Sequence, residues 1–390
     1  MSAQLPHKTK LVKKLRRVVV KIGSSLLSDR RRIDRHRLEA LAADACALHD
    51  RGIDVVLVTS GAIASGIARM GLAQAPKTIP ERQAAAAVGQ IGLMAAYEEF
   101  FAARGKLVAQ ILLTGDDLTN RRRYLNARNT LETLLAARVV PVANENDTVA
   151  VDEIKLGEND NLSALIATLV DADLLVILSD VDGLYNADPR LHPDAALIDV
   201  VERNPTGVLA YATDSAGPVG TGGMASKITA AIKASRAGIA TVIANGIQAH
   251  VLQKIVDPDT SIGTLILAQG DRLTRRKHWI AYSLKPRGTL VVDQGARDAI
   301  IKRGRSLLPS GLREVQGNFG DGDCVRCITA NGVEFARGLI NYSAADLDKI
   351  KGLHSNRIEA VLGYKTSDEI IHRDDLVLTE VERDSPAPDR

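Results

Sequence analysis

The chain is poor in aromatic residues, in cysteine and in net charge, and each shortage narrows what it can be. Phe, Trp and Tyr together make up 3% of its 390 residues, whereas hydrophobic residues make up 45%. The core must therefore consist mainly of Ala, Val, Ile and Leu, which suits buried parallel strands covered by helices. Three cysteines are too few for a disulfide framework, and a net charge of +3 does not by itself indicate nucleic-acid binding.

Two patterns that often carry chemistry do not fit their usual roles here. Cys324 and Cys327 form a C-x-x-C pair, but they lie in an apolar run that predicts a strand, where residues three apart face opposite sides. No second cysteine pair or histidine cluster accompanies them, so we expect neither a metal ion nor a redox role. The run 372–375 is similar to a protein-kinase catalytic loop, but it lacks the Asn and the D-F-G that should follow.

The N-terminus is basic, and the chain has no apolar segment long enough to span a membrane. The basic stretch also lacks the apolar core of a signal peptide. We therefore expect a cytoplasmic protein whose first residues form a disordered, solvated leader.

Apolar strands and helical patterns alternate through the first two-thirds of the chain. Strands are predicted at 18–22, 54–59, 107–113, 138–142, 173–178 and 240–244, and helices at 35–51, 82–104, 162–170 and 228–237. This alternation predicts an α/β fold, namely an αβα sandwich with a mainly parallel open sheet. Ligands of such sheets bind beyond the carboxyl ends of the strands.

The pattern changes near Gly270. Beyond it, short extended segments surround a single predicted helix at 296–302, which indicates a small β-rich second domain. The predicted organisation is a leader at 1–15, a large domain at 16–270, a linker at 271–285, the small domain at 286–364 and a C-terminal tail at 365–390.

The most informative segment is 220–227, which packs three glycines into four residues and ends in Lys227. Glycine N–H groups can converge on an anion, and the start of a helix adds unpaired N–H groups and a positive dipole end. A lysine there can reach the oxygens of a phosphoryl group. The spacing differs from a Walker A loop, and taken alone the run is also consistent with a mobile loop.

Small polar residues and carboxylates also follow other predicted strands. Lys21 leads into Gly23, and further polar residues stand at Ser60, at 144–147 and at 179–180. Two lysines beside glycine N–H groups can hold a phosphoryl group, whose transfer depends mainly on positioning and electrostatics. Asp160 is placed to hold these lysines or to bind a metal ion. The site contains no histidine, so a carboxylate acceptor, which is already ionised at neutral pH, fits better than a hydroxyl.

In sequence order, these motifs resemble the amino acid kinase family over roughly residues 15–380. The matching motifs are 21–25, 58–63, 144–147, 157–163 and 220–227. They are most similar to family members that phosphorylate glutamate in the first step of proline biosynthesis. The segment 285–363 resembles a PUA module, which bacterial members often carry.

The resemblance implies ATP-dependent phosphorylation of the γ-carboxylate of L-glutamate, with Mg²⁺. It assigns catalysis to Lys21, Lys227 and Asp160 and leaves the metal without a named ligand. The implied glutamate-binding residues are Ser60, Asn144, Asp147 and Asn159. The implied ATP-binding residues are Lys21, Gly23, Ser179, Asp180, Thr221, Gly222, Gly223, Met224, Ala225, Ser226 and Lys227.

The resemblance also implies a homo-oligomer (dimer or tetramer), feedback inhibition by proline, and a glutamate-5-semialdehyde dehydrogenase that takes up the product. Two alternatives stay open at this point. One is an enzyme of the same fold with a different acceptor. The other is an RNA-binding protein that acts through the PUA module, which would call for a basic face with exposed aromatic residues.

Overall fold

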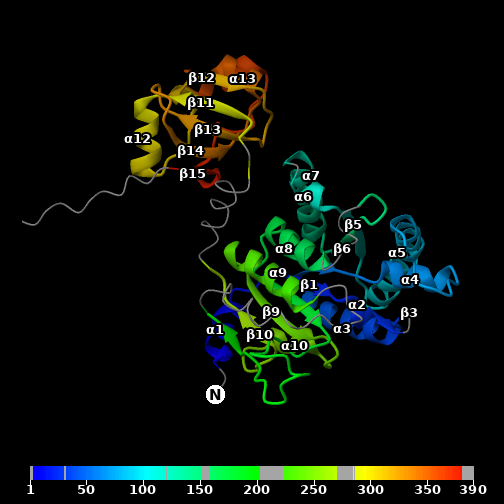
Figure 1. The fold of residues 1–390 in the computed structure, drawn as a ribbon. Coiled ribbons are helices and arrows are strands. Elements are labelled where there is room, and N and C mark those ends of the chain that lie inside the picture. Colours follow the sequence, from blue (N-terminus) through cyan, green and yellow to red (C-terminus); the bar gives the residue numbers. More distant parts are fainter. Residues whose placement is uncertain are drawn as a thin grey trace, which may run out of the picture. The chain divides into compact units, whose positions relative to one another are not determined.

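The computed structural model describes residues 3–29, 32–119, 121–150, 158–202, 223–269, 284 and 286–379. The chain divides into two compact units, Met1–Gln269 and Gly270–Arg390 (Figure 1). Within the described residues, no helix is both long enough and apolar enough to cross a membrane.

The first unit is built on an eight-stranded sheet in the order β5-β6-β4-β1-β7-β9-β10-β8. Its strands are β1 (Arg17–Ile22), β4 (Asp54–Val58), β5 (Val108–Leu113), β6 (Val140–Glu145), β7 (Leu174–Ser179), β8 (Val200–Val201), β9 (Ala240–Asn245) and β10 (Thr264–Ile266). Neighbouring strands are parallel except for the β9–β10 pair. The prediction of a mainly parallel open sheet is therefore confirmed.

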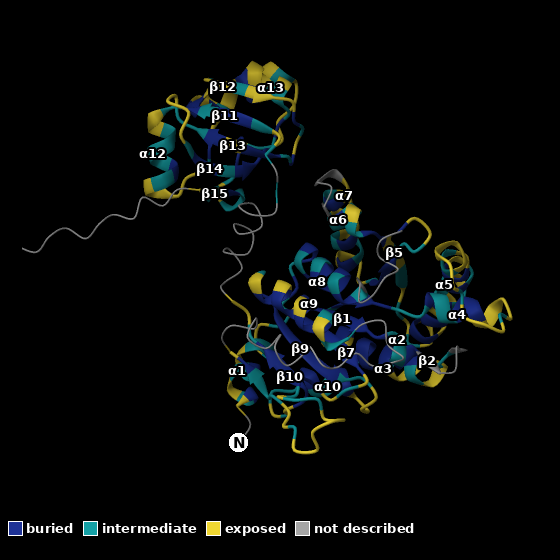
Figure 2. Cartoon of the chain, viewed as in Figure 1, coloured by how far each residue is buried: buried dark blue, intermediate teal, exposed yellow. Residues whose placement is uncertain are grey.

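Helices cover both faces of this sheet, and the central strand shows which side chain goes to which face. Val18, Val20 and Ile22 join a core formed with residues of α3 (Arg35–Asp50), α5 (Ile79–Ala102) and α10 (Val251–Ile255). Side chains alternate along a strand, so Lys21 points to the opposite face, where α8 and α9 pack. Figure 2 shows the strands of the sheet as the buried centre of this unit. The remaining elements are α2 (Ser24–Leu27), β2 (Ser28–Asp29), β3 (Arg32–Ile33), α4 (Ala62–Arg69), α6 (Gly115–Thr119), α7 (Arg121–Ala136), α8 (Glu158–Leu169) and α9 (Met224–Arg236).

The N-terminal residues contradict the predicted disordered leader, because they form helix α1 (Gln4–Val12). The Gln4 side chain is buried and donates hydrogen bonds to the carbonyls of Ile262 and Gly263, both at 3.3 Å. The Lys8 ammonium is also buried and donates to the carbonyls of Lys254, at 2.6 Å, and Thr260. Charge alone suggested solvation, but these two side chains find backbone partners in the large domain.

The second unit contains a five-stranded sheet in the order β12-β11-β13-β14-β15, in which only β11 and β13 are parallel neighbours. This confirms a small, β-rich second domain. Its strands are β11 (Gly288–Val292), β12 (Leu312–Gly317), β13 (Cys324–Ile328), β14 (Glu334–Leu339) and β15 (Leu376–Leu378). Its helices are α12 (Gln294–Arg303), α13 (Ala344–Ile350) and α14 (Ile358–Leu362), and short 3₁₀ turns lie at 309–311, 355–357 and 373–375.

The predicted C-terminal tail starts too early. Ile370 and Ile371 are fully buried in the core of the second unit, and β15 pairs with β14. The small domain therefore continues to Thr379, at the end of the described residues, rather than stopping at 364. The linker predicted at 271–285 lies outside the described residues except for Leu284.

All three cysteines are free and buried. Cys46 lies in the core of the first unit. Cys324 and Cys327 belong to different apolar clusters of the second unit, so the two side chains face opposite sides of β13 as predicted. Burial raises the pKa of Cys327 to about 12, so this thiol stays protonated near neutral pH.

Candidate functional site

Two lysines and one carboxylate meet at the carboxyl end of β1. The Lys21 Nζ lies 2.6 Å from the Asp160 Oδ1, and the Lys227 Nζ lies 3.8 Å from the Asp160 Oδ2. The Ser226 hydroxyl donates a hydrogen bond to the same Oδ2 at 2.7 Å. We call these four residues the lysine cluster. The structure thus brings together the three residues predicted to be catalytic, and it adds Ser226 as a direct partner of the carboxylate.

Three different elements position the side chains of the lysine cluster next to one another. Lys21 is the next-to-last residue of β1, whereas Asp160 and Lys227 each lie in the first turn of a helix, α8 and α9 respectively. A carboxylate near a helix N-terminus is favoured by the helix dipole, and a lysine there stands beside unpaired N–H groups that attract anions. The cluster therefore combines two ammonium groups with two helix N-termini.

Burial makes the charges of the lysine cluster depend on one another. Asp160 is 1% exposed, and Lys21 and Lys227 are each 6% exposed. Burial by itself would raise the pKa of Asp160, but the ammonium groups of Lys21 and Lys227 outweigh it and hold that pKa below its usual value. Burial lowers the pKa of Lys227 below its usual value, although the Asp160 carboxylate opposes this effect. Asp160 therefore stays ionised, with both of its oxygens engaged by the cluster.

A second, neutral group of side chains lies beside the lysine cluster. Asn159, the neighbour of Asp160, donates from Nδ2 to the Ser60 hydroxyl at 2.9 Å and to the Asn144 Oδ1 at 3.3 Å. Asn144 in turn donates from Nδ2 to the Gln90 Oε1 at 2.9 Å. We call Ser60, Asn159, Asn144 and Gln90 the amide chain. Three of its members were predicted to bind the substrate, but no motif indicated Gln90.

The turn that presents Ser60 requires a glycine. Ser60 stands between β4 and α4, and the next residue, Gly61, caps α4 with φ +102°. A side chain in that conformation would be strained, so the glycine permits the sharp passage from strand to helix. The preceding Thr59 hydroxyl is fixed by a buried 2.8 Å hydrogen bond with the Tyr97 hydroxyl on α5.

Asp147 lies in the turn that follows β6, two residues beyond Glu145. Burial raises the pKa of its carboxyl group to about 6. In the described structure no hydrogen bond links Asp147 to the amide chain, so its predicted role in substrate binding stays a prediction.

The predicted ATP-binding residues are described only in part. Gly23 donates from its backbone N–H to the Leu178 carbonyl at 3.3 Å, which places the turn after β1 against the end of β7. Ser179, the last residue of β7, donates to the Asp180 Oδ1 at 3.0 Å. The second group of predicted residues, Gly223, Met224, Ala225, Ser226 and Lys227, forms the cap and first turn of α9. Thr221 and Gly222 lie outside the described residues.

The described side chains offer no cage for a metal ion. No group of three or more His, Cys, Asp or Glu residues in the described ranges is placed to hold one. Both oxygens of Asp160 face lysine or serine groups.

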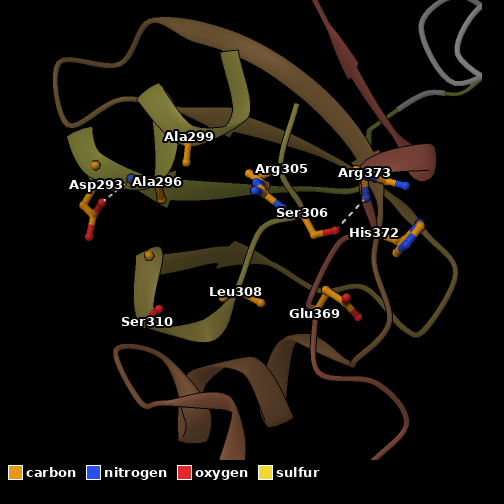
Figure 3. A pocket seen from close by; sticks show the side chains of 12 residues that line it. Asp293, Ala296, Ala299, Arg305, Ser306, Leu308, Ser310, Glu369, His372 and Arg373 are labelled. Atoms are coloured by element: carbon orange, nitrogen blue, oxygen red, sulfur yellow. Dashed lines mark hydrogen bonds between the residues drawn. The ribbon is translucent and has the colours of Figure 1, made fainter. Parts of the chain in front are cut away.

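The second unit contains a cavity of about 720 Å³, which is lined by residues of the second unit alone. Figure 3 shows Asp293, Ala296 and Ala299 on one side, His372 and Arg373 on the other, and Arg305 between them. The remaining lining residues are Gly295, Ser306, Leu308, Ser310, Gly311 and Glu369. Both signs of charge therefore line the cavity.

The described aromatic residues of the second unit are mostly unavailable for stacking on bases. Phe319, Phe335 and Tyr342 are buried in its core, whereas Tyr364 is 46% exposed. Sequence-specific RNA recognition commonly stacks bases on exposed aromatic rings. The described part of this domain therefore gives little support to the RNA-binding alternative.

Comparison with known proteins agrees with this geometry. The family model described as "Amino acid kinase family" matches residues 16–245, and the model described as "PUA domain" matches residues 288–362. A protein of Citrifermentans bemidjiense named "Glutamate 5-kinase" is 52% identical over 94% of this chain and 99% of its own length. Proteins of the same name from Geobacter sp. (strain M21) and Geobacter metallireducens are 52% and 51% identical over 94% and 95% of this chain, and over 99% and 100% of their own lengths.

The family model and these relatives place the mainly parallel sheet, with its paired lysines, among phosphotransferases of the amino acid kinase class. The chain belongs to the amino acid kinase family, in its glutamate 5-kinase branch, and carries a C-terminal PUA domain.

Proposed function

We propose that the protein transfers the γ-phosphoryl group of ATP to the γ-carboxylate of L-glutamate, which is the first step of proline biosynthesis. The observation that carries this proposal is the lysine cluster, in which Lys21 and Lys227 approach the same buried carboxylate from two elements. Its support comes from full-length relatives named "Glutamate 5-kinase" at about half identity.

In the proposed reaction an oxygen of the substrate γ-carboxylate forms a bond to the γ-phosphorus, and the bond from that phosphorus to the β–γ bridging oxygen breaks. The products are ADP and an acyl phosphate. Lys21 and Lys227 neutralise the negative charge on the transferring group, and the N–H groups at the start of α9 add to this stabilisation. Asp160 would pair with both ammonium groups and so hold them near one point.

The acceptor needs no general base, because a carboxylate is ionised at neutral pH. This agrees with the polar groups at the site, which are ammonium, carboxylate, amide and hydroxyl groups. Ser60, Asn144, Asp147 and Asn159 would bind glutamate on the side of the amide chain. Gly23, Ser179, Asp180 and residues 221–227 would hold ATP on the side of the lysine cluster. ATP would enter with Mg²⁺ on its phosphates.

The product sets a requirement for a partner. An acyl phosphate is readily hydrolysed, so an enzyme that reduces it, glutamate-5-semialdehyde dehydrogenase, would have to consume it promptly. We also propose that the protein works in the cytoplasm as a homo-oligomer and that proline inhibits it.

The direct test is hydroxamate formation, in which hydroxylamine traps an acyl phosphate. We expect purified protein to form the hydroxamate only when L-glutamate, ATP and Mg²⁺ are all present. Aspartate, acetate and carbamate serve as alternative acceptors. Turnover of one of these without turnover of glutamate would refute the assignment of the substrate.

A further inference from the structure

Gln90 is the last residue of the amide chain, and it lies outside every sequence motif that predicted the site. The hydrogen bonds run from Asn159 to Ser60 and to Asn144, and then from Asn144 to Gln90. Gln90 lies in the middle of the 24-residue helix α5, between Gly89 and Ile91. Its oxygen is therefore the group that fixes the orientation of the Asn144 amide from outside the motifs.

The packing of α5 holds Gln90 in a constant position relative to Ser60. A Cβ atom at Gly89 would lie 1.8 Å from the carbonyl oxygen of Ala62, so only glycine allows the two backbones to touch there. Ala62 is the first residue of α4, two positions after Ser60. Because interiors are close-packed, a shift of α5 must be passed to α4 and to the turn that carries Ser60. Gln90 on α5 and Ser60 in the turn before α4 thus stand at the two ends of the amide chain, and the helices α5 and α4 are in backbone contact.

Two atoms of the amide chain lack a hydrogen-bond partner in the described structure. The Gln90 Nε2 is a buried donor and the Asn159 Oδ1 a buried acceptor, and neither has a hydrogen-bond partner among the described residues. Leaving a buried polar group unpaired costs free energy. The amide chain is therefore suited to a ligand that brings both a hydrogen-bond acceptor and a hydrogen-bond donor. An amino acid does so, because its carboxylate accepts hydrogen bonds and its ammonium group donates them.

We propose that Gln90 is a positioning residue for the acceptor amino acid. Through Asn144 it orients Asn159 and hence the Ser60 hydroxyl, and the bound amino acid supplies the hydrogen bonds that the amide chain lacks. This inference rests on the proposed function, because it takes the amide chain as the acceptor side of the site. It assigns Gln90 no contact with the phosphoryl group.

The test is Gln90→Met, which keeps the length of the side chain and removes both polar atoms. We expect the KM for L-glutamate to rise about tenfold, the effect of losing one well-placed hydrogen-bond network. The KM for ATP should change less than twofold, because the lysine cluster is untouched. The matched control is Glu98→Gln on the exposed face of the same helix, which should leave both KM values unchanged. If Gln90→Met does not fold, Gln90→Ala gives the same readout and suits a helix interior.

A double-mutant cycle separates positioning from general damage to the helix. If Gln90 acts through the amide chain, Ser60→Ala combined with Gln90→Met should raise the glutamate KM by less than the product of the two single effects. Independent effects that multiply would overturn the inference, as would an unchanged glutamate KM in Gln90→Met or an equal rise in the ATP KM. Wild-type protein without glutamate-dependent turnover would instead refute the proposed function itself.

Discussion

The lysine cluster is built mainly from full charges, whereas the neighbouring amide chain is built from neutral groups. Adjacent residues of α8 belong to the two, Asp160 to the lysine cluster and Asn159 to the amide chain. A buried charge needs a partner of opposite sign, and Asp160 serves two lysines at once. The amide chain can leave a donor and an acceptor unpaired at lower cost. In the described structure the carboxylate of the charged half is paired, whereas the neutral half keeps an unpaired donor and acceptor, which we propose the acceptor amino acid completes.

The largest effect is expected from removing the Asp160 carboxylate, which both lysines of the lysine cluster contact. Asp160→Asn removes the carboxylate that both buried ammonium groups contact, so we expect the protein to lose about 3–5 kcal/mol of unfolding free energy. Chemical denaturation measures this loss. Asn161→Ala, one residue further along α8, is the control. A loss below about 1 kcal/mol would show that the lysines do not depend on Asp160.

The second prediction concerns Lys227 alone. Lys227→Ala removes one preorganised positive charge from the transferring group, so we expect kcat to fall at least about 100-fold. The glutamate KM should change little, because the amide chain remains intact. Lys233→Ala, on the same helix but exposed, is the control in the hydroxamate assay. Near-normal turnover of Lys227→Ala would show that Lys227 does not stabilise the transferring phosphoryl group.

The third prediction uses the Asp147 carboxyl group, whose pKa is raised to about 6 by burial. If its ionised form binds the substrate ammonium group, protonation abolishes the attraction as the pH falls through about 6. We expect kcat/KM for glutamate to fall about tenfold per pH unit below pH 6, and Asp147→Asn to be low and flat over this range. The same raised pKa means that the folded state binds this proton more tightly than the unfolded chain. This group therefore favours folding most below about pH 4, and its contribution declines as the pH rises to 6.

The smallest expected effect is that of substituting Ser226, which tests the contribution of its hydroxyl group. Its hydroxyl donates to the Asp160 Oδ2 at 2.7 Å, the oxygen that also faces Lys227. Ser226→Ala should lower kcat only several-fold, equivalent to about 1 kcal/mol for one hydrogen bond. Ser226→Thr keeps the hydroxyl and should restore most of the activity. Equal losses in the two variants would indicate a steric effect at the start of α9.

Much of the site could be predicted because the carboxyl ends of parallel strands meet at one edge. The polar residues at or just after the ends of β1, β4, β6 and β7 can therefore be predicted from the sequence, as Lys21 and Ser60 show. Gln90 could not be read this way, because it lies inside a helix and reaches the site through a hydrogen bond with Asn144, which is 54 positions away. The sequence has no local pattern that reports such a contact.

The two boundary errors have a related cause. The partner of the Gln4 side chain at Ile262 lies 258 positions along the chain, so a short basic segment looks like a solvated leader until the fold is known. Likewise, Ile370 and Ile371 are buried only because the second unit closes over them. Contacts between distant positions decide both ends, whereas composition reports only local character.

The two units contain different numbers of buried cysteine thiols. One thiol, Cys46, lies in the first unit, and two, Cys324 and Cys327, lie in the second. A thiol reagent such as Ellman's reagent can react with them only when the surrounding core opens. If the second unit opens alone during denaturation, two equivalents will react; if the first opens alone, one will. The chain therefore carries its own stoichiometric reporter of which domain unfolds first, without added dyes or new cysteines.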